Sequence, residues 1–219
     1  MSRFLLLVIS LCLYTLIVST AQAETRFFPP GVWGKTQGSW TTEGRDAFYE
    51  EWFGGQLAAM KELPLPKVQS KTNALVVLRL LFLPTFDHGG MVRVAFLSGG
   101  RVKYEFKSLS GAGGYDPGQV NYRKKGNLSP EAAAELNALI EKIAPFTGKT
   151  STEQDSPEYI CTDGTQIVLE FASKGAYQVI SRHECDLKRT DDIRALTHLL
   201  DNVAGGRLIT EYTFVDPVE

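Results

Sequence analysis

Four segments between residues 74 and 123 carry the hydrophobic pattern of β-strands. Residues 74–83 are almost continuously apolar, which is typical of a strand buried on both faces. Residues 91–97 form a second strand-like segment. Residues 102–107 alternate apolar side chains with Lys and Glu, which predicts a strand with one face in water. A fourth, shorter strand is expected at residues 120–123, and the connections are too short for crossover helices, so we expect antiparallel pairing.

Helical patterns flank these strands. Residues 43–61 predict a helix that the Leu-Pro-Leu-Pro run at 63–66 ends, because proline breaks a helix interior. A second helix is expected at 129–143, where Ser, Pro and Glu open an apolar stripe. A third is expected at 190–205, between a Thr-Asp-Asp cap and a glycine pair. The predicted fold class is α+β, with mostly antiparallel sheet packed by two or three helices.

A β-hairpin is predicted at residues 165–184, with its turn at Ser173-Lys174-Gly175. Cys161 and Cys185 would then lie within a few residues of being opposite each other at the open end of the hairpin. A disulfide between them would contribute roughly 3 kcal/mol to stability through loop closure. Metal binding and a reactive thiol are the alternatives for this pair.

Residues 1–23 have the three parts of a cleavable secretory signal peptide. Arg3 supplies the positive charge, residues 4–18 are an apolar run, and Ala21 and Ala23 form an A-x-A cleavage site. The run is shorter than the roughly 20 residues that a membrane helix needs. We therefore expect a periplasmic or secreted protein, in which Cys161 and Cys185 are the cysteines that remain after cleavage.

Composition narrows the classes of partner. The chain has 23 Lys and Arg against 25 Asp and Glu, and loss of Arg3 with the leader would leave 22 against 25, a net charge of −3. This balance lacks the excess of basic residues that is typical of proteins that bind nucleic acid or anionic lipid. We expect an aromatic lead-in and first helix at 24–73 and an α+β globular domain at 74–219, together forming one soluble domain with no membrane insertion after cleavage.

The lead-in is rich in aromatic residues. It is expected to lie irregularly over the domain surface, where Trp33 and Trp40 are candidates for binding a partner or a glycan. Phe48 and Trp52 are spaced as on one face of a helix, which favours ordinary core packing.

Two arginines lie within apolar strands. Arg79 interrupts the 74–83 segment, and Arg93 stands between two valines. Burying a lone guanidinium is costly, so each must reach water or a carboxylate. One interpretation is a structural ion pair with Glu105 or Glu170. The other is a pocket in which Arg79 and Arg93 bind a carboxylate or phosphate ligand, a task that suits the planar guanidinium.

The glycine-rich stretch 111–118 is a second candidate for ligand binding. Its backbone amides, at Gly113, Gly114 and Tyr115 above all, could hold an anion. The spacing does not fit G-x-G-x-x-G and no strand-to-helix context follows, so a tight surface loop is the alternative.

Histidines are the remaining candidates for chemistry. Asp87 and His88 are adjacent and could provide a general base or metal ligands. The segment 183–186, His-Glu-Cys-Asp, could hold a metal or simply end the hairpin. No motif for a serine hydrolase, zinc protease, P-loop or EF-hand occurs in the chain, and no catalytic residue, cofactor or metal is predicted.

Short motifs spread over residues 74–204 carry a family resemblance. They are Arg79, Phe86-Asp87-His88, Gly111 to Gly118, Asp163-Gly164, Leu169-Glu170, Gly175-Ala176-Tyr177 and Arg182. In these motifs the chain resembles a group of uncharacterised exported bacterial proteins, a domain of unknown function. The chain departs from that group at Ile167, where an aromatic residue is expected, and at Gly89, where a proline is expected. The resemblance implies a bacterial envelope setting and carries no catalytic residue over.

The leading hypothesis is a non-catalytic exported domain that binds a small anionic ligand or an envelope protein. Its candidate surface comprises Arg79, Arg93 and the 111–118 loop. One alternative is an envelope hydrolase that uses Asp87 and His88, and another is a structural or inhibitory interaction module.

Overall fold

A six-stranded antiparallel sheet forms the centre of an α+β fold. The computed structural model describes residues 26–33, 41–143, 163–187 and 191–209. The strand order is β4-β3-β2-β1-β5-β6. The strands are β1 (Val76–Pro84), β2 (His88–Phe96), β3 (Val102–Ala112), β4 (Val120–Asn127), β5 (Thr165–Ser173) and β6 (Ala176–His183).

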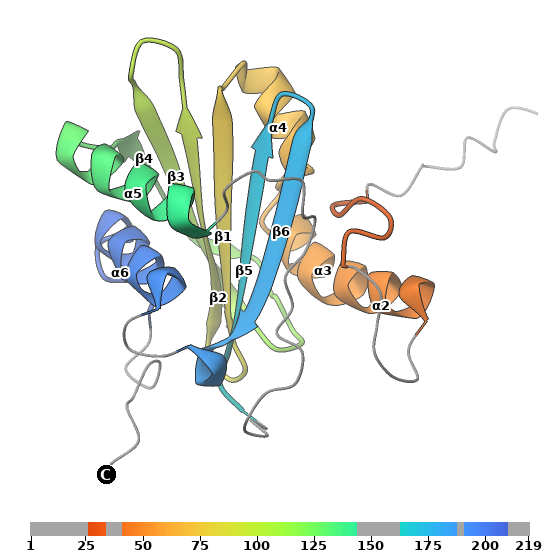
Figure 1. Ribbon diagram of the computed structural model, residues 1–219. Coiled ribbons are helices and arrows are strands. Elements are labelled where there is room, and N and C mark those ends of the chain that lie inside the picture. Colours follow the sequence, from red (N-terminus) through yellow and green to blue (C-terminus); the bar gives the residue numbers. More distant parts are fainter. Residues whose placement is uncertain (1–25, 34–40, 144–162, 188–190, 210–219) are drawn as a thin grey trace, which may run out of the picture.

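Helices cover both faces of this sheet (Figure 1). One face carries α2 (Thr42–Tyr49), a π-helical turn (Glu50–Gly54), α3 (Gly55–Ala59) and α4 (Leu65–Thr72). The other face carries α5 (Pro130–Ile143) and α6 (Asp192–Ala204). A short 3-10 helix, Glu184–Asp186, follows β6. No helix in the described ranges is long and apolar enough to cross a membrane.

The predicted strands and hairpin are confirmed. The hairpin register runs from Gln166 opposite His183 to Ser173 opposite Ala176, so Lys174 and Gly175 form its turn, within the predicted turn segment. The buried segment at 74–83 is β1, which pairs with β2 on one side and β5 on the other. Strands β2, β3 and β4 are longer than their apolar patterns suggest, because ladder hydrogen bonds continue into polar residues.

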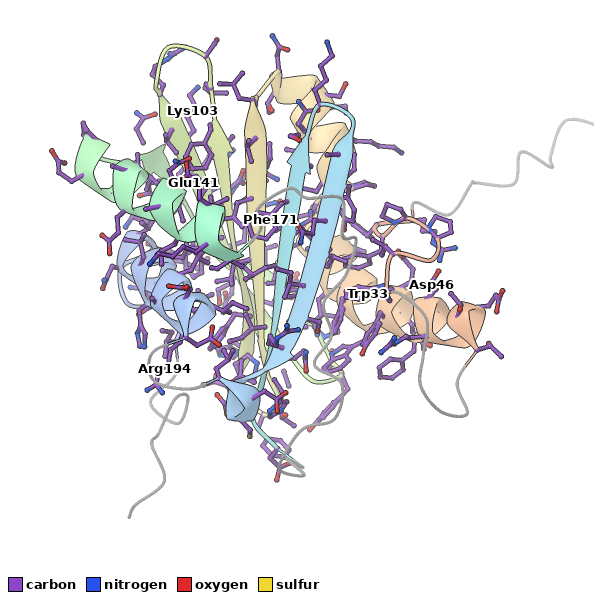
Figure 2. The ribbon with its side chains drawn as sticks, viewed as in Figure 1. Trp33, Asp46, Lys103, Glu141, Phe171 and Arg194 are labelled. Atoms are coloured by element: carbon purple, nitrogen blue, oxygen red, sulfur yellow. The ribbon has the colours of Figure 1, made fainter. Side chains whose placement is uncertain are left out.

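The α5–α6 face holds the largest apolar cluster. Leu136 and Ile140 of α5 and Leu196 and Leu200 of α6 pack on alternating strand residues such as Phe171, which points between the sheet and α5 (Figure 2). The predicted caps are present. Ser129 accepts a hydrogen bond from the amide of Ala132, Asp191 accepts one from Ile193, and Gly205 closes α6 with φ +87°.

Residues 26–33 of the aromatic lead-in belong to the core, which corrects the expectation that this segment lies over the surface. Phe27, Phe28 and Trp33 are buried against α2 and α3, and Trp33 lies on this side of the sheet in Figure 2. Two carboxylates hold the lead-in in place. Asp46 accepts from the amide of Gly31 at 2.6 Å, and Glu50 accepts from Phe27 at 2.7 Å and Phe28 at 3.1 Å. Trp40 lies outside the described residues.

Phe48 corrects another expectation in the same region. Its helical spacing with Trp52 favours a core position, yet Phe48 is 42% exposed and packs edge-on against Trp52 at the surface. Phe53 and Leu57 are the helical residues that fill this core instead. The π-helical turn between α2 and α3 changes the helical phase, so the spacing of an ideal α-helix does not identify the buried face here.

Helix α4 is absent from the sequence-based expectation. The proline run at 63–66 ends the preceding helix but also starts α4, with Pro64 as its N-cap and Pro66 in its first turn. Proline is tolerated there because the first amides of a helix have no intrahelical partner. Leu65 and Val68 then pack on Val77 of β1, which places α4 over one end of the sheet.

Candidate functional site

A row of charged side chains crosses the sheet on the face that carries α2, α3 and α4. In register, the row runs through five adjacent strands as Lys125, Glu105, Arg93, Arg79 and Glu170. Neighbouring strands lie about 4.8 Å apart, so each of these side chains adjoins the next. Arg79 and Arg93 stand directly opposite each other, which places two positive charges side by side at the centre of the row.

Arg79 forms a buried salt bridge with Glu170. The guanidinium donates to the two carboxylate oxygens at 2.6 and 2.8 Å, and a further N–H reaches the carbonyl oxygen of Leu63 at 2.8 Å. Burial alone would lower the pKa of Arg79, but the charge and hydrogen bonds of Glu170 outweigh it and the net shift is upward. Tyr177 donates to the same carboxylate at 2.9 Å, and burial together with this negative charge raises the pKa of Tyr177 well above its usual value.

Glu62 supplies the negative charge between the two arginines. It lies in the turn that follows α3 and is 6% exposed. Its carboxylate accepts from Arg93 and from Lys107 Nζ, the latter at 2.5 Å, and lies 3.6 Å from Arg79. Lys107 also donates to the carbonyl oxygen of Met60 at 2.8 Å. One carboxylate from the helical layer therefore joins three cations of the sheet.

Glu105 is the carboxylate at the open end of the row. It accepts from Arg93 at 2.5 Å and from Arg123 at 2.6 Å, and it lies 3.8 Å from Lys107 and 3.6 Å from Lys125. Burial would raise the pKa of Glu105, but the charge of Arg93, followed by Arg123, Lys107 and Lys125, lowers it overall. The carboxylate is therefore ionised and surrounded by cations.

The helical layer does not cover this end of the row, and a groove of about 600 Å³ opens there. We call it the sheet groove. It is lined by Val68, Thr72, Arg93, Ala95, Leu97, Lys103, Tyr104, Glu105, Lys125, Gly126 and Asn127. Figure 2 shows Lys103 on β3, at the end of the sheet where α4 lies. The volume is in the range typical of small-molecule sites.

Positive charge exceeds negative charge around the sheet groove. In the described part of the chain, two carboxylates on this part of the face, Glu62 and Glu105, meet five cations. The cations are Arg93, Lys103, Lys107, Arg123 and Lys125. Arg79 is excluded because Glu170 neutralises it. The difference of five and two is a local surplus of three positive charges, in a chain whose net charge is −2.

The structure separates the predicted ligand-binding residues. Arg79 is fully buried with its donors on protein acceptors, so it is a structural ion pair and is closed to a ligand. Glu170 and Glu105 are the carboxylate partners that the ion-pair interpretation names. Arg93 also pairs with carboxylates, but its side chain keeps 20% of its surface exposed and lines the sheet groove.

The 111–118 loop lies at the other end of the sheet, so it does not join the arginines. Gly113 donates to the carbonyl oxygen of Asp87 and accepts from the side chains of Trp52 and Gln56. A Cβ on Gly113 would lie 2.8 Å from backbone atoms of Leu83 and Pro84. Close packing of the loop against β1 therefore explains this glycine without a ligand. Gly114 approaches Thr85 as closely, and Tyr115 is exposed.

The other chemical candidates do not assemble into a site in the described residues. The Asp87 carboxylate accepts from the backbone N–H of His88 at 2.6 Å, while the imidazole of His88 faces the carbonyl oxygen of Gly111. This geometry gives the Asp87–His88 hydrolase hypothesis no support. No group of three metal-binding side chains occurs within these ranges. Cys185 lies in the 3-10 helix after β6, but Cys161 is outside the described residues, so the disulfide stays a prediction.

A second, larger groove of about 1270 Å³ runs along α2, α3 and the lead-in. Its walls carry several carboxylates, including Glu43 and Glu51. Asp46 and Glu50 already bind the backbone amides of the lead-in, so their charges act in holding that segment. We therefore take the sheet groove as the better candidate site.

Sequence reasoning missed Glu62, Lys103 and Lys125. The alternation at 102–107 correctly placed Lys103, Glu105 and Lys107 on one face, but the prediction that this face is in water is wrong for Glu105 and Lys107, which are buried. The alternation could not show that α4 and the 60–63 turn stand over part of that face. Comparison of the chain with protein-family models, curated proteins and solved structures finds no match.

Proposed function

We propose that this protein is an exported binding domain, periplasmic or secreted, that takes an anionic ligand in the sheet groove and acts by binding rather than catalysis. The observation that carries the proposal is the local surplus of positive charge at an open concave surface. Lys103 and Lys125 are exposed there, and Lys125 shares Glu105 with three other cations. An anion would relieve the repulsion among these side chains.

Removing two groove lysines should weaken anion binding. We expect acetate, inorganic phosphate or decanoate to bind saturably to the protein, as measured by isothermal titration calorimetry at constant ionic strength. In the double variant Lys103→Ala/Lys125→Ala the affinity should fall about tenfold, because each exposed charge contact contributes up to about 1 kcal/mol. Chemical shifts should change at Lys103, Lys125 and Asn127 in the NMR spectrum of the wild type.

The matched control removes two exposed lysines elsewhere. Lys142 lies on α5 and Lys174 lies in the β5–β6 turn, and neither lines the sheet groove. The variant Lys142→Ala/Lys174→Ala changes the net charge equally and should leave the affinity within about twofold of wild type. Failure of every anion to bind would contradict the proposal. An equal loss of affinity in both double variants would show that the loss reflects only the change in net charge, not the groove lysines.

Export is the second part of the proposal and rests on the signal-like residues 1–23. Expression in a bacterial host should yield a periplasmic or secreted protein that begins at Glu24, as determined by intact mass and amino-terminal sequencing. Leu6→Arg should retain the full-length chain in the cytoplasm, because a charge in the apolar run blocks recognition of the signal. A wild-type chain that remains full-length inside the cell would contradict the proposal that the protein is exported.

The same exported sample tests the predicted disulfide. An oxidising compartment permits a Cys161–Cys185 bond. We expect neither cysteine to react with an alkylating reagent in denaturant until a reductant is added. Two modified cysteines without a reductant would show that the pair is free in the exported protein.

A further inference from the structure

We infer that the ligand of the sheet groove is an amphipathic anion, with a carboxylate or phosphate head and an apolar chain. This inference rests on the proposed function and names the chemical class of its ligand. The head group would meet Lys103 and Lys125, and the chain would lie along the apolar wall beneath α4.

The lining of the sheet groove divides into two parts by chemistry. Val68 of α4, Ala95 of β2 and Leu97, which directly follows β2, form an apolar wall. In the sheet register, Ala95 stands opposite Lys103, and Lys103 stands opposite Asn127. The wall therefore passes into the charged strands within one strand spacing, about 4.8 Å. A ligand that uses the whole groove needs an apolar part and an anionic part close together.

The apolar wall is accessible at the surface. Ala95 and Leu97 are half-buried at the edge of the α4 cluster, whereas Val77, which stands opposite Ala95 on β1, and Leu65 of α4 are fully buried. Contact with a ligand chain would remove the remaining apolar surface of Ala95 and Leu97 from water. Each buried methylene raises affinity about fourfold. A small hydrophilic anion cannot make use of this wall.

The cationic part selects the sign of the head group. Glu105 is surrounded by Arg93, Arg123, Lys107 and Lys125. Its negative charge is therefore already compensated and would not attract a cationic ligand. Lys103 has no ion-pair partner among the described residues. An ammonium head would approach this surplus of like charge, whereas a carboxylate or phosphate would be attracted to it.

The test is a chain-length series titrated into the protein by calorimetry. We expect affinity to rise at least tenfold from acetate to decanoate, kept below its micelle-forming concentration, and to rise similarly from inorganic phosphate to decyl phosphate. Which pair binds more tightly decides whether the head is a carboxylate or a phosphate. Leu97→Ser should remove most of the chain-length gain, while Lys103→Glu should weaken every anion in the series.

The outcomes separate this inference from the proposed function. If acetate and phosphate bind as tightly as their ten-carbon counterparts, the amphipathic class is wrong and anion binding stands. If no anion binds, both proposals fail. If decyltrimethylammonium binds as tightly as decanoate, the groove does not select an anionic head and both fail. Circular dichroism of Leu97→Ser checks folding, and the uncharged substitution Ala95→Ser provides a second variant of the apolar wall.

Discussion

Replacing Glu170 with glutamine should destabilise the protein by about 3 to 5 kcal/mol, the usual cost of removing one partner from a buried ion pair. Arg79 is completely buried, and Glu170 is the carboxylate that accepts two of its hydrogen bonds. The variant keeps the shape of the side chain but leaves a guanidinium without its principal counter-charge in the core. Tyr177 would also lose a charged acceptor. Urea unfolding followed by circular dichroism measures the loss.

A double variant distinguishes a buried charge from simple loss of packing. Arg79→Met/Glu170→Leu removes both charges and keeps apolar volume, so we expect it to be more stable than Glu170→Gln despite carrying two substitutions. Its stability should still fall short of the wild type, because the carbonyl oxygen of Leu63 and the hydroxyl of Tyr177 lose their partners. A coupling energy of at least about 2 kcal/mol between the two positions is expected.

Lys142→Ala provides the surface comparison for this experiment. Lys142 pairs with Asp192 at 3.4 Å, and both side chains are well exposed. Its removal should change the free energy of unfolding by less than about 0.5 kcal/mol. Should Glu170→Gln cost as little as Lys142→Ala, Arg79 would have to reach solvent, and the sealed ion pair described here would be wrong.

Glu62→Gln is expected to have the second-largest effect, a loss of about 3 kcal/mol. Glu62 is the carboxylate that separates Arg79 from Arg93, which are directly opposite in the sheet, and it also binds Lys107. Neutralising it removes the negative charge that Arg79, Arg93 and Lys107 share, and it leaves buried Lys107 without its nearest carboxylate. The loss should be partly reversed at 1 M salt, which screens the partly exposed charge of Arg93.

Hydrogen exchange should localise the effect of Glu62→Gln. Because Glu62 ties the turn after α3 to the sheet, amides of α3 should lose protection before those of β1. Glu51→Gln is the matched control, since Glu51 is exposed in the helical turn that precedes α3. It should leave both stability and exchange close to wild type. Uniform loss of protection in Glu62→Gln would show that the carboxylate does not act as a local link.

The local sequence pattern was sufficient to predict most of the strands in the sheet. Alternation and turn residues located β5 and β6 to within a residue, because a hairpin register depends only on its turn. The need of Arg79 for a carboxylate also followed from its apolar neighbours. The prediction for the lead-in was wrong, and α4 was not predicted. Aromatic residues and prolines permit several local structures, and only packing on the sheet selects among them.

Less of the candidate site could be predicted from the sequence. The spacing of Lys103, Glu105 and Lys107 defines one face of β3, but the partners of Glu105 and Lys107 come from residues 62, 93, 123 and 125. Such pairings depend on the register of three strands and on the height of a helical turn above them. Neither quantity is encoded in a short segment.

The sequence by itself determined the strands, the two helices that follow caps, and the requirement that buried arginines be paired, because these depend on nearest neighbours and on the cost of burying charge. Tertiary structure alone decided which carboxylate meets which cation and where the charged face stays open. Glu62 reaches the centre of the row because α3 ends above it, and the sheet groove exists because α4 covers β1 but leaves β3 and β4 uncovered.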